Sequence, residues 1–87
     1  MPQGADAEFH HAMMTMQHEM GSMKMTGDAD QDFVAMMIPH HRGAVDMSKV
    51  ELKYGKDPEL KKLAQDIIKA HDDEIKFMQA WQAKHQK

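Results

Sequence analysis

The 87-residue chain contains no cysteine, which excludes disulfides, thiolate metal sites, iron–sulfur clusters and cysteine nucleophiles. Aromatic residues make up only 6% of the chain. No apolar run approaches the roughly 20 residues that span a bilayer, so membrane insertion is not expected. With 11 basic against 14 acidic side chains and no basic block, the charge pattern of a nucleic-acid-binding protein is missing. A chain of 87 residues should form one small domain, residues 1–87, whose thin core a bound ion or a second copy would help to stabilise.

Glycine, proline and aspartate divide the chain into three helical segments, and no strand pattern is present. The segments cover residues 7–26, 30–54 and 58–84, and Asp57 followed by Pro58 is typical of a helix start. Since the loops are short, successive helices should pack as antiparallel neighbours. The pattern therefore predicts an all-α, antiparallel three-helix up-and-down bundle. The second helix has so broad an apolar face that we expect self-association to complete the bundle and make a homo-oligomer.

Methionine is the most informative residue type, because six of the 11 methionines lie between Met13 and Met25. Helical steps of three and four make a packing stripe of Phe9, Met13, Met16, Met20 and Met23. A second stripe on the same helix mixes imidazole and thioether groups that packing does not require. It predicts an outer metal site made of His10, His11, Met14 and His18. The alternative interpretation of this stripe is a solvated helix face near the chain end.

The second and third helices offer an inner candidate site. Met36, His40 and Met47 fall on one strip of the second helix, at spacings i, i+4 and i+11. On the third helix His71 and Glu74 face inward, and burying them is unfavourable unless they pair or bind an ion. A hydrogen-bonded network of these two residues with His41 is the alternative interpretation. The full inner set of candidate ligands is Met36, Met37, His40, His41, Met47, His71, Glu74 and Met78.

The chemistry of these side chains favours copper. Thioethers are neutral, soft ligands that prefer Cu(I) and Ag(I), whereas imidazole binds copper in both oxidation states. A mixed methionine and histidine site should therefore prefer Cu(I) and also accept Cu(II) or Ag(I). Because a protonated imidazole does not bind metal, affinity should fall as the pH drops below about 6.5.

The segment from Phe33 to Met47 reads FVAMMIPHHRGAVDM. It resembles the ferritin-like helical domains catalogued as domain of unknown function 305. Further similar motifs are Gly-x-x-Pro-Glu-Leu at 55–60, Ala-x-x-Ile-Ile at 64–68 and Glu-Ile-x-x-Met-x-x-Trp at 74–81. The resemblance implies a helical bundle in a periplasmic or secreted protein, and some such proteins bind copper or silver and contribute to copper tolerance. Among the candidate ligands it draws attention to Met37, His40, His41, Met47, Glu74 and Met78, and the family usually carries Gln where this chain has His71.

We expect a protein that binds copper through methionine and histidine for sequestration, tolerance or transfer in the cell envelope, with a copper-transfer protein as partner. The first residues have neither the basic nor the apolar region of a signal peptide, so the periplasmic or secreted location rests on the resemblance. A metal-independent, methionine-rich interaction module is the first alternative. A cuprous oxidase or ferritin-like redox protein is the second. Since the sequence has no paired Glu-x-x-His signature and no carboxylate cage, we do not expect an enzyme.

Overall fold

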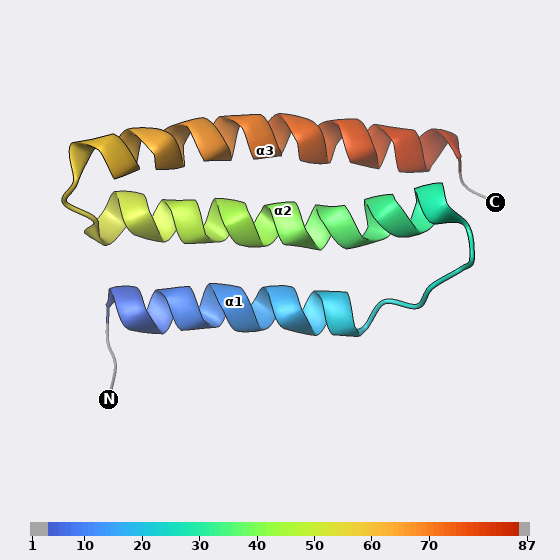
Figure 1. Cartoon of the computed structure of the whole chain (residues 1–87), viewed down its shortest axis with the longest axis horizontal. Coiled ribbons are helices and arrows are strands. Elements are labelled where there is room, and N and C mark those ends of the chain that lie inside the picture. Colours follow the sequence, from blue (N-terminus) through green and yellow to red (C-terminus); the bar gives the residue numbers. More distant parts are fainter. Residues whose placement is uncertain (1–3, 86–87) are drawn as a thin grey trace.

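The computed structural model describes residues 4–85 as three α-helices joined by short loops (Figure 1). Helix α1 covers Ala5–Gly21, α2 covers Ala29–Tyr54 and α3 covers Pro58–Lys84. Successive helices run in opposite directions, and α2 packs against both of its neighbours. The expected all-α architecture of three packed helices is therefore confirmed.

The three helices form a single layer with α2 in the middle. Among residues 4–85, no Cα atom of α1 lies within 8 Å of a Cα atom of α3, and the molecule measures 45 × 28 × 15 Å. Figure 1 shows the helices side by side when the layer is viewed along its shortest axis. No large side chain of the described residues is completely buried. A single layer of helices therefore leaves much of its apolar surface without a cover, and the expected self-association stays a prediction.

Helix α1 ends at Gly21, earlier than the expected end at residue 26. Glycine is a poor helix former, because ordering its backbone costs more conformational entropy than ordering that of any other residue. The Ser22 hydroxyl then donates a hydrogen bond of 2.8 Å to the carbonyl of His18, and the Ser22 N–H donates to the same oxygen. These bonds pair the His18 carbonyl in the last turn of the helix, and residues 22–28 then form a loop.

Aspartate side chains begin both longer helices. The Asp28 carboxylate accepts hydrogen bonds from the backbone N–H groups of residues 30 and 31, and Asp57 accepts one from Leu60. Each acceptor satisfies amide groups that have no partner within the helix itself. Pro58 then occupies the first turn of α3, as the sequence predicts.

Helix α1 packs closely against α2. A Cβ atom added to Gly43 would lie 2.5 Å from Sδ and 3.0 Å from Cβ of Met16, so this position has room only for hydrogen. Near the start of α1, the Glu8 carboxylate accepts hydrogen bonds from the Tyr54 hydroxyl and from Lys53 Nζ, the latter at 3.0 Å. One steric fit and one polar cluster thus hold α1 on α2.

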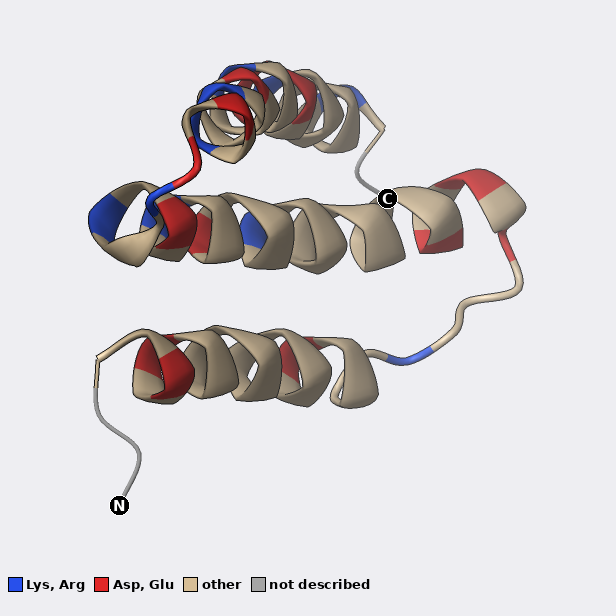
Figure 2. Ribbon diagram, turned by 60° about the vertical axis from the view of Figure 1, so that its left-hand side comes forward, with Lys and Arg blue, Asp and Glu red and all other residues tan. Residues whose placement is uncertain are grey.

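Helices α2 and α3 share the main apolar cluster of the molecule. Val34, Ile38 and Met78 are buried there, and Met37 and Trp81 pack against them. Residues 33–41 of α2 carry no charged side chain, and Figure 2 shows this uncharged stretch between charged segments of the ribbon. The apolar half of the layer is therefore the half that holds Met37, His41, Glu74 and Met78 among the candidate inner ligands.

Candidate metal centre

Two histidines and one glutamate meet where α2 faces α3. His41 Nε2 lies 2.9 Å from Oε1 of Glu74, and His71 Nδ1 lies 3.5 Å from the same oxygen. The imidazole rings of His41 and His71 have their centroids 4.3 Å apart. One ligand atom from each of the three residues lies within 4.8 Å of the other two. No other group of three or more His, Asp or Glu side chains comes together in this way within residues 4–85.

Helix geometry explains the approach of these three side chains. His71 and Glu74 are three residues apart on α3, so they project from neighbouring points on one face. His41 lies on the face of α2 that packs against α3, and only 8% of the residue is exposed. The Glu74 side chain, by contrast, is 55% exposed. The centre is therefore buried on the α2 side and reached by solvent on the Glu74 side.

Two ring nitrogens at the centre are buried and lack hydrogen-bond partners. They are His41 Nδ1 and His71 Nδ1. His71 Nδ1 is close enough to Glu74 for an ion pair, but the geometry there is not that of a hydrogen bond. Buried polar atoms in native proteins are almost always paired with protein, water or an ion. No protein group forms a hydrogen bond with either atom, and of the two only His71 Nδ1 faces the Glu74 carboxylate.

The spacing of the ligand atoms suits an ion. In a tetrahedral site with metal–ligand bonds of about 2.1 Å, ligand atoms lie roughly 3.4 Å apart. The contact of the Glu74 carboxylate with His71, at 3.5 Å, is close to this spacing, and the contact with His41, at 2.9 Å, is shorter. The three residues, with ligand atoms within 4.8 Å of one another, could therefore hold a metal ion.

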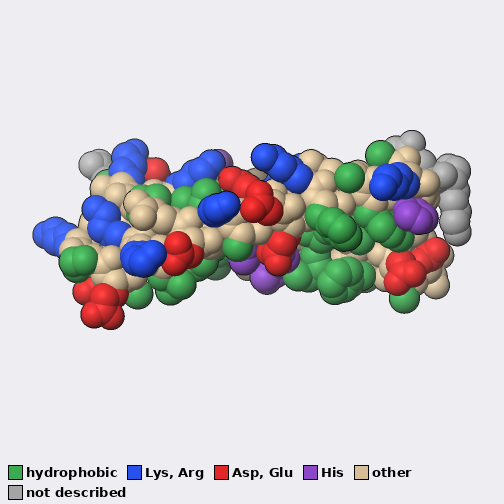
Figure 3. Space-filling view, turned by 90° about the horizontal axis from the view of Figure 1, so that it is seen from above, with side chains coloured by type: hydrophobic (Ala, Val, Ile, Leu, Met, Phe, Trp, Pro, Cys, Tyr) green, Lys and Arg blue, Asp and Glu red, His purple; other side chains and the backbone are tan. Residues whose placement is uncertain are grey.

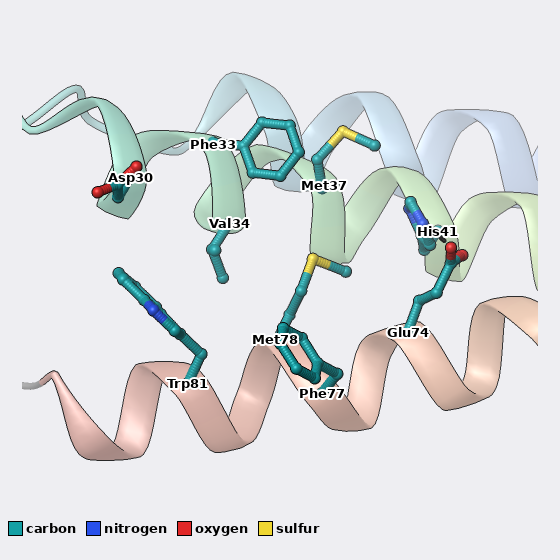
Figure 4. Close-up of a pocket in the computed structure, with 9 residues that line it drawn as sticks. All are labelled: Asp30, Phe33, Val34, Met37, His41, Glu74, Phe77, Met78 and Trp81. Carbon is teal, nitrogen blue, oxygen red and sulfur yellow. Dashed lines mark ion pairs between the residues drawn. The ribbon is translucent and has the colours of Figure 1, made fainter.

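An open groove of about 590 Å³ leads away from the centre between α2 and α3. Figure 4 shows Met37 and Met78 in this groove, between the aromatic side chains and the pair formed by His41 and Glu74. Two thioethers therefore share a cavity with the imidazole and the carboxylate. Figure 3 shows hydrophobic side chains gathered over this half of the molecule, with histidine beside them.

Phe77 forms part of the groove wall and was not among the residues that the helical pattern selected. It lies beside the inward stripe of α3, and 72% of it is exposed. The sequence signal that could have identified Phe77 is its large aromatic side chain outside the packing stripe of the helix. Packing of the helix against its neighbour does not explain an aromatic residue at that position.

The remaining inner candidates lie outside the group of three. His40 is exposed, and its ring centroid is 6.1 Å from that of His41. Met36 is half-buried and does not line the groove. Met47 lines a different groove, together with Phe9 of α1. Of the eight inner candidates, the structure thus brings together His41, His71 and Glu74, with Met37 and Met78 in the adjoining groove.

The outer candidates all lie on α1 and are exposed. They are His10, His11, Met14 and His18. His11 lines a third groove, between α1 and α2, with Asp46 and Lys49. Helical spacing keeps His11, Met14 and His18 on one stripe, but none of the four belongs to the centre between α2 and α3. They remain a separate candidate site.

None of the helices in the described range has the length and apolarity needed to cross a membrane.

An uncharacterized protein of Acanthamoeba polyphaga mimivirus is 45% identical over 49 residues, which make up 56% of this chain and 32% of that protein. The chain thus aligns with only about a third of the length of this relative. Residues 1–82 match the family described as Domain of unknown function (DUF305). This match includes α1, α2 and almost all of α3. The chain therefore belongs to the DUF305 family.

Proposed function

We propose that this protein binds a copper ion between α2 and α3, with His41, His71 and Glu74 as ligands. The observation that carries the proposal is the convergence of two imidazoles and one carboxylate, each with a ligand atom within 4.8 Å of the other two, where His71 Nδ1 is buried and has no hydrogen-bond partner. A metal ion would satisfy unused ligand capacity that is otherwise costly to bury.

The thioethers of Met37 and Met78 favour copper over other metals. Two imidazoles and one carboxylate suit Cu(II) and several other divalent ions, whereas thioethers select Cu(I) and Ag(I). Both kinds of ligand line one groove. The site is therefore suited to copper in either oxidation state, with the methionines shifting preference toward Cu(I).

The proposed role is sequestration, tolerance or transfer of copper in the cell envelope, in a periplasmic or secreted protein. Thioethers form no disulfides, so a cysteine-free copper site suits an oxidising compartment. The exposed side of Glu74 supplies a route by which an ion enters or passes to a copper-transfer partner. This role requires binding and release, and it requires no catalytic turnover.

The test is an anaerobic titration of the metal-free protein with Cu(I) against a chromophoric chelator. It compares the wild type with His41→Ala/His71→Ala and with His11→Ala/His18→Ala, which removes the same number of imidazoles from the exposed stripe of α1. We expect the first double variant to lose tight binding and the second to retain it. Circular dichroism of each variant shows whether the helices are retained.

Two outcomes contradict the proposal. Loss of binding in the α1 variant alone would move the site to the outer stripe. Absence of tight copper binding in the wild type would favour the metal-independent interaction module.

A further inference from the structure

One side of the helical layer exposes large apolar side chains from more than one helix. Phe33 on α2 is 56% exposed and Phe77 on α3 is 72% exposed, and both line the groove that leads from the metal centre. Leu60 and Leu63 are exposed farther along α3, and Met13 is exposed on α1. Apolar patches that extend over several elements are uncommon on monomeric proteins and usually mark an interface.

The two apolar grooves open on the same side of the layer. Phe33 and Met47, fourteen residues apart on α2, differ by about 40° around the helix axis. Leu63 and Trp81, eighteen residues apart on α3, point in the same direction. Phe33 and Trp81 line the groove at the metal centre, while Met47 and Leu63 line the second groove together with Phe9 of α1. The grooves therefore belong to one apolar face that extends across all three helices.

The opposite side of the layer is polar. Arg42, Lys49 and Lys53 lie on that side of α2, about half a turn from Phe33, and all three are exposed. Only one face of the layer is thus apolar and exposed to solvent.

We propose that a second copy of this chain packs on the apolar face. Small domains enclose a core between two packed layers, whereas residues 4–85 supply one layer in which no large side chain is completely buried. The layer measures 45 by 28 Å in its own plane, so one face exceeds the roughly 800 Å² per partner that a stable interface buries. Residues 33–41 of α2 contain no Asp, Glu, Lys or Arg, so two copies related by a two-fold axis can meet along this stretch without opposing carboxylates or ammonium groups. Asp30 and Glu74 lie at the ends of the groove.

The second copy also covers the metal centre. The centre opens toward solvent at Glu74, next to Phe77 on the exposed side of the groove. A copy packed on this face therefore shields the ligands from water and slows the exchange of a bound ion, so that entry or hand-over at the Glu74 side requires the two copies to separate. This consequence rests on the proposed copper site, whereas the pairing of the two chains does not.

The test is sedimentation equilibrium of the full 87-residue chain at micromolar concentration, with a chelator present to remove metal. We expect a particle of twice the 10.0 kDa chain mass. The variant Phe33→Glu/Phe77→Glu should sediment as a monomer while its circular dichroism stays helical. The matched control is Gln65→Glu/Gln79→Glu, which introduces the same charge on exposed positions of the outer side of α3 and should remain a dimer.

A monomeric wild type, or a phenylalanine variant that stays dimeric, would overturn the inference. Because metal is absent throughout, the result does not depend on the copper proposal. If the protein is a dimer but does not bind copper tightly, this inference stands and the proposed function is refuted. If it is a monomer that binds copper tightly, the proposed function stands and this inference is refuted.

Discussion

Oε1 of Glu74 lies 2.9 Å from Nε2 of His41, and this contact joins α3 to α2 at the edge of the apolar groove. The same oxygen is 3.5 Å from His71 Nδ1. One carboxylate therefore serves two imidazoles, and it provides the only negative charge among the three proposed ligands. Its removal is the sharpest single test of the centre.

Replacing Glu74 with glutamine keeps the shape of the side chain and removes its charge. We expect Glu74→Gln to weaken copper binding by at least about tenfold, because a neutral amide is a poorer metal ligand. The melting temperature of the metal-free protein should change little, since the Glu74 side chain is more than half exposed. Chelator competition measures the affinity. Asp72→Asn makes the same charge change at an exposed position of α3 and should bind as the wild type does.

The two methionines of the groove should control the preference for oxidation state. Met37→Leu/Met78→Leu nearly conserves volume and removes both thioethers. We expect Cu(I) and Ag(I) affinity to fall while Cu(II) affinity stays close to that of the wild type, because imidazole and carboxylate ligands remain. Separate titrations with Cu(I) and Cu(II) measure the two affinities. Equal losses for both ions, or a similar loss in Met13→Leu/Met20→Leu on α1, would refute a role for the groove methionines.

Bound copper should stabilise the fold, because the ligands come from two helices. At a free copper concentration 100 times the dissociation constant, linkage gives about 2.7 kcal/mol, or a rise of roughly 10 to 20 °C in melting temperature for a domain of this size. Thermal denaturation with and without copper measures the shift. His71→Ala should abolish it, whereas His10→Ala on the exposed side of α1 should retain it. A wild-type shift that survives in His71→Ala would place the stabilising ion elsewhere.

The close approach of α1 and α2 depends on Gly43. Gly43→Val should lower the free energy of unfolding by about 1 to 3 kcal/mol, because the new side chain overlaps Met16. Chemical denaturation measures the loss. Gly21→Val is the control, since a Cβ added there meets no atom within 4 Å. Equal losses in the two variants would show that helix propensity, and not the contact with Met16, sets the cost.

Acid should loosen α1 through Glu8. The hydrogen bond from Tyr54, and then that from Lys53, hold the Glu8 pKa below its ordinary value of 4.5. A group whose pKa is lowered by folding stabilises the native state above its unfolded pKa, and the contribution disappears as the pH falls through the folded pKa. Tyr54→Phe should therefore be less stable than the wild type at neutral pH, and the two should converge below pH 4.5.

Urea midpoints across this pH range measure the convergence. Glu19→Gln, on the same helix, should keep the pH dependence of the wild type. A stability gap between Tyr54→Phe and the wild type that is unchanged at acid pH would contradict the role of Glu8.

The sequence determined the helices and much of their surface. Periodic apolar residues and the Asp57–Pro58 pair predicted three helices, and the structure has them. Two ion pairs on the exposed face of α3 join residues four apart in the sequence, Lys62 with Asp66 and Lys69 with Asp73. These features depend on neighbours within one helix or one turn, and such contacts follow from the local chain alone.

Tertiary structure decided which candidate ligand side chains lie close together. Periodicity sets the direction of a side chain around its own helix, but it does not set the position of α2 along α3. Met47 lies six residues beyond His41, about 9 Å farther along the α2 axis. The axial register of the two helices places His41 opposite His71 and Glu74 and leaves Met47 in another groove. The packing of α1 on the far side of α2, away from α3, likewise decided that the apolar face stays uncovered.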